Sequence, residues 1–451
     1  MRRLTIWGER KGRRGVGLGL ILVAFGAGAV RCLREAPPEG FRPGGAGVTV
    51  APDRTVASRS EEAARGGLRT DFVSLRAGVR THAASLVELK NGDIRAFWYA
   101  GTNEGTRDVT IRTAVLETRT SGWGPERVVT SRERTQEEVW RYVKKLGNPV
   151  VSRAPDGALW LFYVTVSVGG WAGSSITMIR SQDDGETWEK ARRLVTSPFL
   201  NISTLVKGPA ITYTDGTMGL PVHHEFLGKF GELLRIDAQG DVVDKVRLSS
   251  GREALQPLVL VRDENRALVL MRYAGKARPR RVLSTTTGNA GRTWTAPTGS
   301  LLPNSDAALA GMVLADGRML VALNDTEERR ERLSLVVSSD GGASWRTIYR
   351  VEDQSEPAWQ GLNETDYAAV IERLGEKTVG ARRGASDYAS SVKRVMFSKQ
   401  GNTFEFSYPS LIRASGGDFH LAYTWNEAFI KHVQFSQAWL DERLQADARL
   451  H

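Results

Sequence analysis

Residues 181–188 read SQDDGETW, and residues 338–345 read SSDGGASW. A weaker copy, TGNAGRTW, occupies residues 287–294. In this pattern the aspartate or asparagine can accept hydrogen bonds from turn N–H groups, the glycine takes a positive φ, and the tryptophan packs back between strands. We therefore interpret the three boxes as structural turns and assign them no catalytic role.

A second repeat is interleaved with these boxes. Six times an apolar run, a turn and another apolar run follow one another, which is the signal of a β-hairpin. The turns lie at Asn91-Gly92, Asp156-Gly157, Asp215-Gly216, residues 263–265, Asp316-Gly317 and Gly416-Gly417. Their spacing is 48 to 65 residues except for the last gap of 100, which we assign to an insertion at about 354–403.

About sixty residues per unit, repeated six times, predict an all-β protein with the fold of a six-bladed β-propeller over residues 71–437. The alternative is a β-sandwich with fortuitous spacing. The insertion is either a lid over a site or a surface elaboration. Residues 438–451 are expected to form a helical tail.

Charge and apolar residues are distributed unevenly along the chain. The formal net charge is +11, and more than half of this excess lies before residue 36, so the basic balance does not indicate a nucleic-acid partner. The basic start runs into the apolar stretch Gly15 to Val30, which predicts a signal peptide or a membrane anchor over residues 1–34. A Pro- and Gly-rich flexible linker is expected over residues 35–70. These features predict an exported chain, either anchored on the periplasmic side of the inner membrane or secreted.

The hairpins and boxes together resemble the sialidase (neuraminidase) superfamily, in particular its bacterial branch of predicted neuraminidases with BNR or Asp-box repeats. The similarity covers about Asp71 to Phe435, apart from the insertion. It implies a propeller whose last blade takes its fourth strand from the N-terminal side of the chain, here DFVSL at residues 71–75.

Polar residues gather where the first strands of the hairpins begin and where the second strands end. In a propeller these positions face one central pocket. Six candidates precede or open a first strand: His82, Asn148, Lys207, Gln256, Asn304 and Tyr408. Others follow a second strand or precede a third: Glu104, Arg107, Asp108, Glu225, Arg272, Arg330 and Trp425. Carboxylates, arginines and aromatic rings on one concave face suit an acidic sugar.

The resemblance implies roles for five of these residues. Glu104 corresponds to the acid/base of the family, with Asp108 in reserve. Tyr408, in the sequence Tyr-Pro-Ser-Leu, corresponds to the nucleophile, and a neutral phenol does not repel an anionic substrate. Arg272 and Arg330 match the second and third arginines that hold the sugar carboxylate.

Two positions depart from the family pattern. His82 stands where the first arginine is expected, and Gln256 stands where a glutamate would activate the tyrosine. An amide cannot accept the phenolic proton. Either Glu253, Glu225 or His82 replaces the missing base, or the reaction is not sialoside hydrolysis by the mechanism of the family.

Three functions remain open at this stage. The first is an exo-α-sialidase-like glycoside hydrolase that cleaves a terminal sugar from a glycan or polysaccharide. The second is a polysaccharide lyase in which His82 and Tyr408 act as base and acid. The third is a non-catalytic glycan-binding or assembly propeller. The expected partners are a glycan and, through the N-terminal segment, a membrane. No cofactor is expected, and no metal, because His223 and His224 are adjacent strand residues that face opposite ways. The sequence leaves the oligomeric state open.

Overall fold

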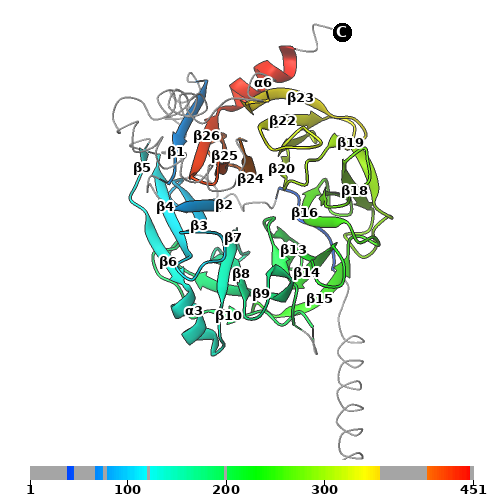
Figure 1. Ribbon diagram of the computed structural model, residues 1–451. Coiled ribbons are helices and arrows are strands. Elements are labelled where there is room, and N and C mark those ends of the chain that lie inside the picture. The colour runs from blue at the N-terminus through cyan, green and yellow to red at the C-terminus, as the bar shows by residue number, and fades with distance from the viewer. Residues whose placement is uncertain are drawn as a thin grey trace, which may run out of the picture. The chain divides into compact units, whose positions relative to one another are not determined.

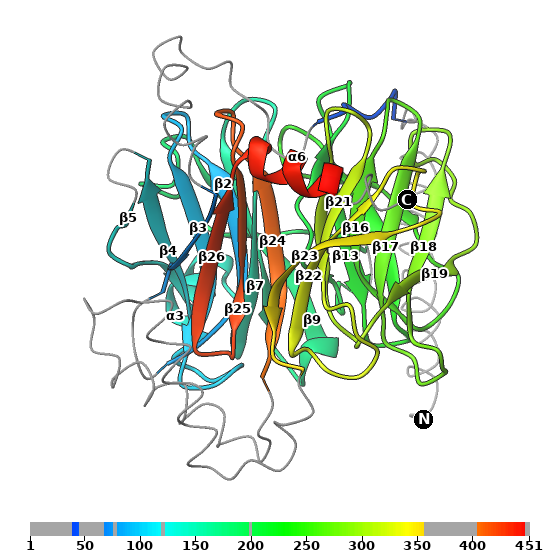
Figure 2. The same ribbon diagram turned by 90° about the horizontal axis from the view of Figure 1, so that it is seen from above.

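The computed structural model of the protein describes residues 38–44, 67–74, 79–118, 122–197, 201–355 and 404–446. In this part of the chain, six antiparallel sheets stand in a ring around a common axis (Figure 1). The predicted six-bladed β-propeller is confirmed, and a β-sandwich is excluded. Figure 2 shows the same ring from the side, with the strands running roughly along the axis.

Each blade consists of four strand positions, and the first strand lies nearest the axis. Blade 1 contains β2 (Arg80–Glu88), β3 (Ile94–Gly101), β4 (Thr110–Glu117), β5 (Gly122–Trp123) and β6 (Arg127–Ser131). Blade 2 contains β7 (Lys145–Arg153), β8 (Leu159–Val166), β9 (Ser174–Ser181) and β10 (Arg192–Arg193). Blade 3 contains β11 (Leu205–Val206), β12 (Ile211–Thr212), β13 (Met218–His224), β14 (Phe230–Ile236) and β15 (Val242–Arg247). Blade 4 contains β16 (Ala254–Val261), β17 (Ala267–Tyr273), β18 (Arg281–Thr287) and β19 (Thr298–Pro303).

Blade 5 is formed by β20 (Ala310–Val313), β21 (Met319–Leu323), β22 (Arg332–Ser338) and β23 (Arg346–Asp353). Blade 6 is formed by β24 (Phe406–Arg413), β25 (Phe419–Trp425), β26 (Phe429–Phe435) and β1 (Leu68–Phe72). β1 pairs with β26 from Leu68↔Phe435 to Phe72↔Lys431. The N-terminal side therefore closes the last blade as predicted, although the strand starts three residues before Asp71.

The three boxes connect the third and fourth strands of blades 2, 4 and 5. In the first box the Asp183 carboxylate accepts hydrogen bonds from Ser181 Oγ (2.8 Å), Thr187 N (2.9 Å) and Thr187 Oγ1 (2.6 Å). Gly185 has φ 92°, and a Cβ there would lie 3.2 Å from side-chain atoms of Arg95 and Trp188. The hydrogen bonds from Thr187 and Ser181 lower the pKa of Asp183 to about 2. The boxes are structural turns, as their sequence indicates.

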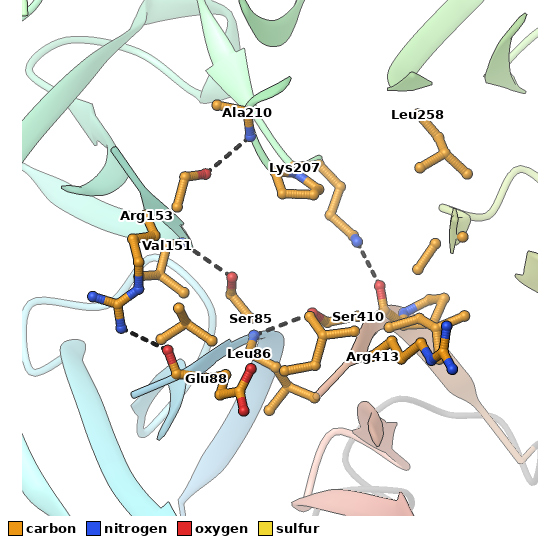
Figure 3. A pocket seen from close by; sticks show the side chains of 18 of the residues that line it. Ser85, Leu86, Glu88, Val151, Arg153, Lys207, Ala210, Leu258, Ser410 and Arg413 are labelled. Atoms are coloured by element: carbon orange, nitrogen blue, oxygen red, sulfur yellow. Dashed lines mark hydrogen bonds between the residues drawn. The ribbon is translucent and has the colours of Figure 1, made fainter. Parts of the chain in front are cut away.

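Serine side chains join the inner strands of neighbouring blades. Ser410 Oγ accepts the N–H of Leu86, and Ser85 Oγ accepts the N–H of Val151. Ser152 Oγ accepts the N–H of Ala210 in the same way, so blades 6, 1, 2 and 3 are linked in succession. These bonds satisfy backbone donors that no strand of the same blade can reach. Figure 3 shows the pocket that these residues line.

Parts of the predicted linker 35–70 pack against the blades. Phe41 is fully buried, and its N–H donates to Glu264 O (2.7 Å) while Arg42 N donates to Thr212 O (2.9 Å). Burial of the Phe41 ring against Tyr213 (5.2 Å between centroids) accounts for this order. Residues 68–70 belong to β1. The predicted anchor at 1–34, the rest of the linker and most of the insertion at 354–403 lie outside the described residues.

Helices are few in the described part of the chain. They are α3 (Arg132–Val139), the 3-10 turn η1 (Trp171–Gly173) and α6 (Gln437–Ala446). α6 lies where the helical tail was predicted, and its Trp439 packs edge-on against Tyr349 of β23 (5.0 Å). None of the helices among the described residues has the length and apolar character needed to span a bilayer.

Candidate active site

The candidate site is built on backbone irregularities in four inner strands. β2, β7, β16 and β24 each lose register by a bulge near their first residues. Inside these bulges four residues other than glycine have a left-handed backbone: Ala83 (φ 58°), Asn148 (46°), Gln256 (51°) and Tyr408 (53°). A bulge re-aims a side chain that would otherwise follow the strand alternation, and such strain gathers at functional sites.

Tyr408 and Gln256 are joined by a direct hydrogen bond. Gln256 Nε2 donates to Tyr408 Oη (2.9 Å), and Gln256 Oε1 accepts from Arg272 Nη1 (3.1 Å). Arg272 can only donate, which fixes the orientation of the amide. Tyr408 Oη is consequently an acceptor toward Gln256, and its own proton must point to another group.

Three guanidinium groups surround Asp306, which has a left-handed backbone (φ 57°) just before blade 5. Arg272 Nε donates to Asp306 Oδ1 (2.5 Å), and Arg330 Nη2 donates to Asp306 O (2.6 Å). Arg280 Nη2 lies 4.0 Å from Asp306 Oδ2. Arg330 Nη1 also donates to Glu405 Oε1 (2.8 Å). The two arginines expected to hold a sugar carboxylate are thus brought together, on a framework of carboxylates.

His82 packs against the nucleophile candidate, with 4.3 Å between its ring centroid and that of Tyr408. Burial lowers the pKa of His82, which outweighs the opposing effect of Glu427 and Glu104. Its Nδ1 has no hydrogen-bond partner among the described residues. This neutral imidazole packs on the phenol ring, but Nδ1 makes no direct hydrogen bond to Tyr408 Oη, so proton exchange between the two side chains requires a bridging water.

Glu104 lies on the same side of the site, in the loop after β3. Its Oε1 accepts a hydrogen bond from Trp171 Nε1 (3.0 Å), and the Lys145 ammonium lies 3.9 Å from the centroid of the Trp171 ring. Burial raises the pKa of Tyr99 well above its usual value, and both Glu104 and Tyr408 add to this effect. Tyr99 therefore lies within electrostatic reach of both proposed catalytic groups.

Three further candidates belong to blades 2 and 3. Lys207 Nζ donates to Pro409 O (2.7 Å), and burial lowers the pKa of the Lys207 amine to about 7 (Figure 3). Glu225 lies 3.5 Å from buried His223, and His223 lowers the pKa of Glu225. Asn148 is buried at its bulge.

Four predicted site residues are placed differently. Trp425 is 1% exposed and packs among Phe72 and Phe406, so it offers no surface to a sugar. Asn304 is fully buried. Its Oδ1 accepts a hydrogen bond from Tyr273 N, and its Nδ2 donates one to Ala307 O. Trp425 is therefore part of the hydrophobic core, and the Asn304 side chain is used in hydrogen bonds to the backbone. Asp108 accepts from Thr102 N (2.7 Å), Thr102 Oγ1 (2.7 Å) and the Thr106 hydroxyl, which lower its pKa against the effect of burial, so it shapes the loop. Arg107 is exposed in that same loop.

Sequence reasoning missed Trp171, Asp306 and Glu405. Trp171 follows the second strand of blade 2, a position at which a polar or aromatic side chain was sought in the other blades. Asp306 comes two residues after Asn304, and Glu405 directly precedes β24. Glu253, one of the alternative bases, is exposed at the start of blade 4. In the described part of the chain, no three His, Cys, Asp or Glu residues form a group that could hold a metal ion.

Comparisons with known proteins agree with this architecture. A profile of the BNR repeat-like domain matches residues 92–421. The Hadza microbial sialidase Hz136 is 16% identical with a TM-score of 0.57, and the match covers 79% of this chain and 66% of that one. A protein of unknown function from Dyadobacter fermentans DSM 18053 is 12% identical with a TM-score of 0.57, covering 82% and 100%.

The intramolecular trans-sialidase from Ruminococcus gnavus, solved with oseltamivir carboxylate, is 11% identical with a TM-score of 0.56, covering 80% of this chain and 95% of that one. At these identities the structural likeness establishes the fold alone. A search of the curated proteins finds no match.

Proposed function

Because this chain belongs to the sialidase superfamily with BNR repeats, we propose that it is an exo-acting glycoside hydrolase that removes a terminal acidic sugar from a glycan. The observation that carries the proposal is the placement of Tyr408. Its hydroxyl is held by Gln256 on a strained bulge, beside His82 and the Arg272–Asp306–Arg330 cluster. Glu104 lies close enough to affect the same neighbours.

The proposed reaction has two steps. Tyr408 Oη attacks the anomeric carbon while the bond to the leaving oxygen breaks, and Glu104 gives its proton to that oxygen. The phenolic proton passes to His82 through a bridging water. Water then attacks the anomeric carbon and gives a proton to Glu104, and Tyr408 leaves and regains its proton from His82.

The arginines support an anionic substrate. Arg272 and Arg330 are both partly exposed, at 14% and 22% of their side chains, so a ligand can reach them. A planar guanidinium suits a carboxylate because its donors can bind both oxygens. Asp306 and Glu405 hold the two groups in place and reduce the side-chain entropy lost on binding.

Tyr408→Phe and Glu104→Gln test the proposal. Turnover of a panel of aryl sialosides, deoxy-ulosonides and uronides is expected to fall by about 10³-fold in each variant. Tyr349→Phe and Glu117→Gln, on outer strands away from the site, are matched controls and are expected to keep the wild-type rate. Unaltered turnover in both site variants would reject the assignment.

A polysaccharide lyase is the second candidate, favoured by the 4.3 Å contact of the His82 and Tyr408 rings. The Gln256 donor turns the phenolic proton outward, as an acid on a leaving group requires. A lyase forms an unsaturated product that absorbs in the near ultraviolet, and a hydrolase does not. Binding of sugar with no product on any substrate would instead indicate a non-catalytic propeller.

We also propose that the chain is exported and stays at the membrane or is secreted. This rests on the basic start and the apolar stretch Gly15 to Val30. Fractionation of cells that express the full chain tests it, since recovery in the cytoplasm would contradict the proposal.

A further inference from the structure

Trp140 has the most exposed of the large apolar side chains in the described ranges, at 94%. Tyr142, two residues later, is 52% exposed. An exposed tryptophan is costly in water, because its ring leaves a large apolar area in contact with solvent until a partner covers it. Isolated exposed apolar residues are common, but an aromatic pair that shares one depression is informative.

The backbone at Trp140 is strained. It forms the C-cap of α3 with φ 51° and ψ 42°, and its N–H bonds to Gln136 O. Glycine takes this conformation freely, whereas a tryptophan there costs about 1 kcal/mol. A large ring that is both strained and solvent-exposed gains nothing for the fold, which points to a role in binding.

The helix that carries Trp140 is firmly attached to the propeller. Thr135 Oγ1 is buried against Tyr163 Oη (3.0 Å), and Glu138 Oε2 accepts the N–H of Ala191 (2.8 Å). Ser131 caps the first turn of α3 by accepting from Arg134 N (3.2 Å). The backbone of Trp140 is therefore presented by a rigid element, which limits the backbone entropy lost when a ligand binds.

The depression beside the helix has the lining of a sugar site. Its lining residues are Gln136, Glu137, Trp140, Arg141 and Tyr142. Two are aromatic and three carry planar hydrogen-bonding groups, and there is no aliphatic side chain among them. Aromatic faces bind the apolar faces of pyranose rings, while amide, carboxylate and guanidinium groups match hydroxyl pairs.

We propose that this depression is a second carbohydrate-binding site, which holds a pyranose unit of the extended glycan outside the candidate active site. Figure 1 places α3 on the outer edge of the ring, away from the axis. Arg141 Nε donates to Ser167 Oγ (2.8 Å) and Lys144 Nζ to Gly169 O (3.4 Å), in the loop that continues to Trp171. The second site and the wall of the candidate active site thus share one loop of blade 2.

The experiment uses the purified full chain in native affinity gels that contain dextran, barley β-glucan or polysialic acid. Retardation by at least one polymer is expected, and the Trp140→Ala/Tyr142→Ala double variant is expected to bind it about tenfold more weakly. Leu301→Ala, which removes a 69% exposed side chain from β19, is the matched control and keeps wild-type retardation. Near-ultraviolet circular dichroism confirms that both variants are folded.

Absence of retardation by all three polymers, or equal retardation of the wild type and the double variant, overturns the proposal. Sedimentation tests the alternative occupant, because a dimer that dissociates in the double variant would assign Trp140 to an interface between copies of the chain. The proposal does not depend on hydrolysis. Loss of turnover in the site variants with retained retardation would leave it intact.

Discussion

Both ends of the propeller contain residues with a left-handed backbone, but the residue types at these positions differ. At the end that carries the hairpin turns, the left-handed positions of five blades are glycines with φ between 83° and 95°, namely Gly92, Gly157, Gly216, Gly317 and Gly417. At the site end, the left-handed positions in the inner-strand bulges are Ala83, Asn148, Gln256 and Tyr408. Glycine avoids this strain in the hairpin turns, whereas the inner-strand bulges retain it, as do Asp184 (φ 58°) and Ala290 (φ 57°) inside two of the boxes.

Polar groups differ in the same way. At the turn end, hydrogen bonds from the box residues lower the pKa of Asp183 and Asp340 to about 2. At the site end, burial lowers the pKa values of His82 and Lys207. Buried oxygens of Ser305 and Ser407 have no hydrogen-bond partner among the described residues. A buried polar atom without a partner costs free energy, so each such group calls for an explanation, such as a bound water or a catalytic role.

Among the changes that compare the two ends, Gln256→Glu should produce the largest effect. The new carboxylate would lie at hydrogen-bond distance from Tyr408 Oη and could accept its proton directly, with Arg272 still paired to its other oxygen. We expect kcat on an aryl sialoside to rise by about 10²-fold, measured from steady-state kinetics across pH.

A combined Gln256→Glu/His82→Phe variant sharpens this test. If His82 is the base of the natural enzyme, its loss should matter less in the Gln256→Glu background than it does in the wild type. An unchanged or lower kcat for Gln256→Glu would contradict the view that the amide limits Tyr408.

The boxes should affect the stability of the fold in acid and should have no effect on catalysis. Asp183 and Asp340 have folded pKa values below their ordinary value of 3.8, so their contribution to stability is complete above about pH 4 and is lost as the pH falls toward 2. The third box already has Asn289, whose Oδ1 accepts from Thr293 N (3.0 Å) as Asp183 Oδ1 does from Thr187 N.

Asp183→Asn/Asp340→Asn should therefore unfold below the wild-type temperature at pH 7, where the two carboxylates are charged, and should lose less stability than the wild type between pH 4 and 2. Thermal unfolding followed at several pH values measures this. Turnover at pH 7 should be unchanged. A large loss of kcat in the double variant would show that the turn end is coupled to the site.

The turn end was also the more predictable from sequence. Asn-Gly, Asp-Gly and box residues act through contacts within a few positions, so Asp183 and Thr187 could be assigned from their spacing alone. The blade count followed from the same repeats, and the closing strand β1 followed from the family resemblance. The order in residues 38–44 could not be foreseen, because Phe41 is held by Tyr213 and Glu264, far along the chain.

The site was predicted only in outline. Tyr408, Gln256 and His82 were placed together because strand starts converge in a propeller. The roles of Trp171 and Asp306 depend on contacts between blades, 67 residues apart for Trp171 with Glu104 and 34 for Asp306 with Arg272. Trp425 was wrongly predicted to face the site because it ends a second strand. The position of a strand end in the sequence does not show which face of the sheet packs against the next blade.

The smallest effects should come from exchanging the backbone preferences of the two ends. Gly216 has φ 83°, and a Cβ at this position would have no atom within 4 Å, so Gly216→Ala is expected to cost about 1 kcal/mol through backbone strain alone. Ala83→Gly relieves similar strain, but it frees the unfolded chain and removes a buried methyl group, 2% exposed. We expect these opposing terms to leave its unfolding free energy within about 0.5 kcal/mol of the wild type. Urea unfolding measures both variants. A gain of more than about 1 kcal/mol for Ala83→Gly would mean that the strain at the site end is uncompensated, and that its retention must be explained by activity alone.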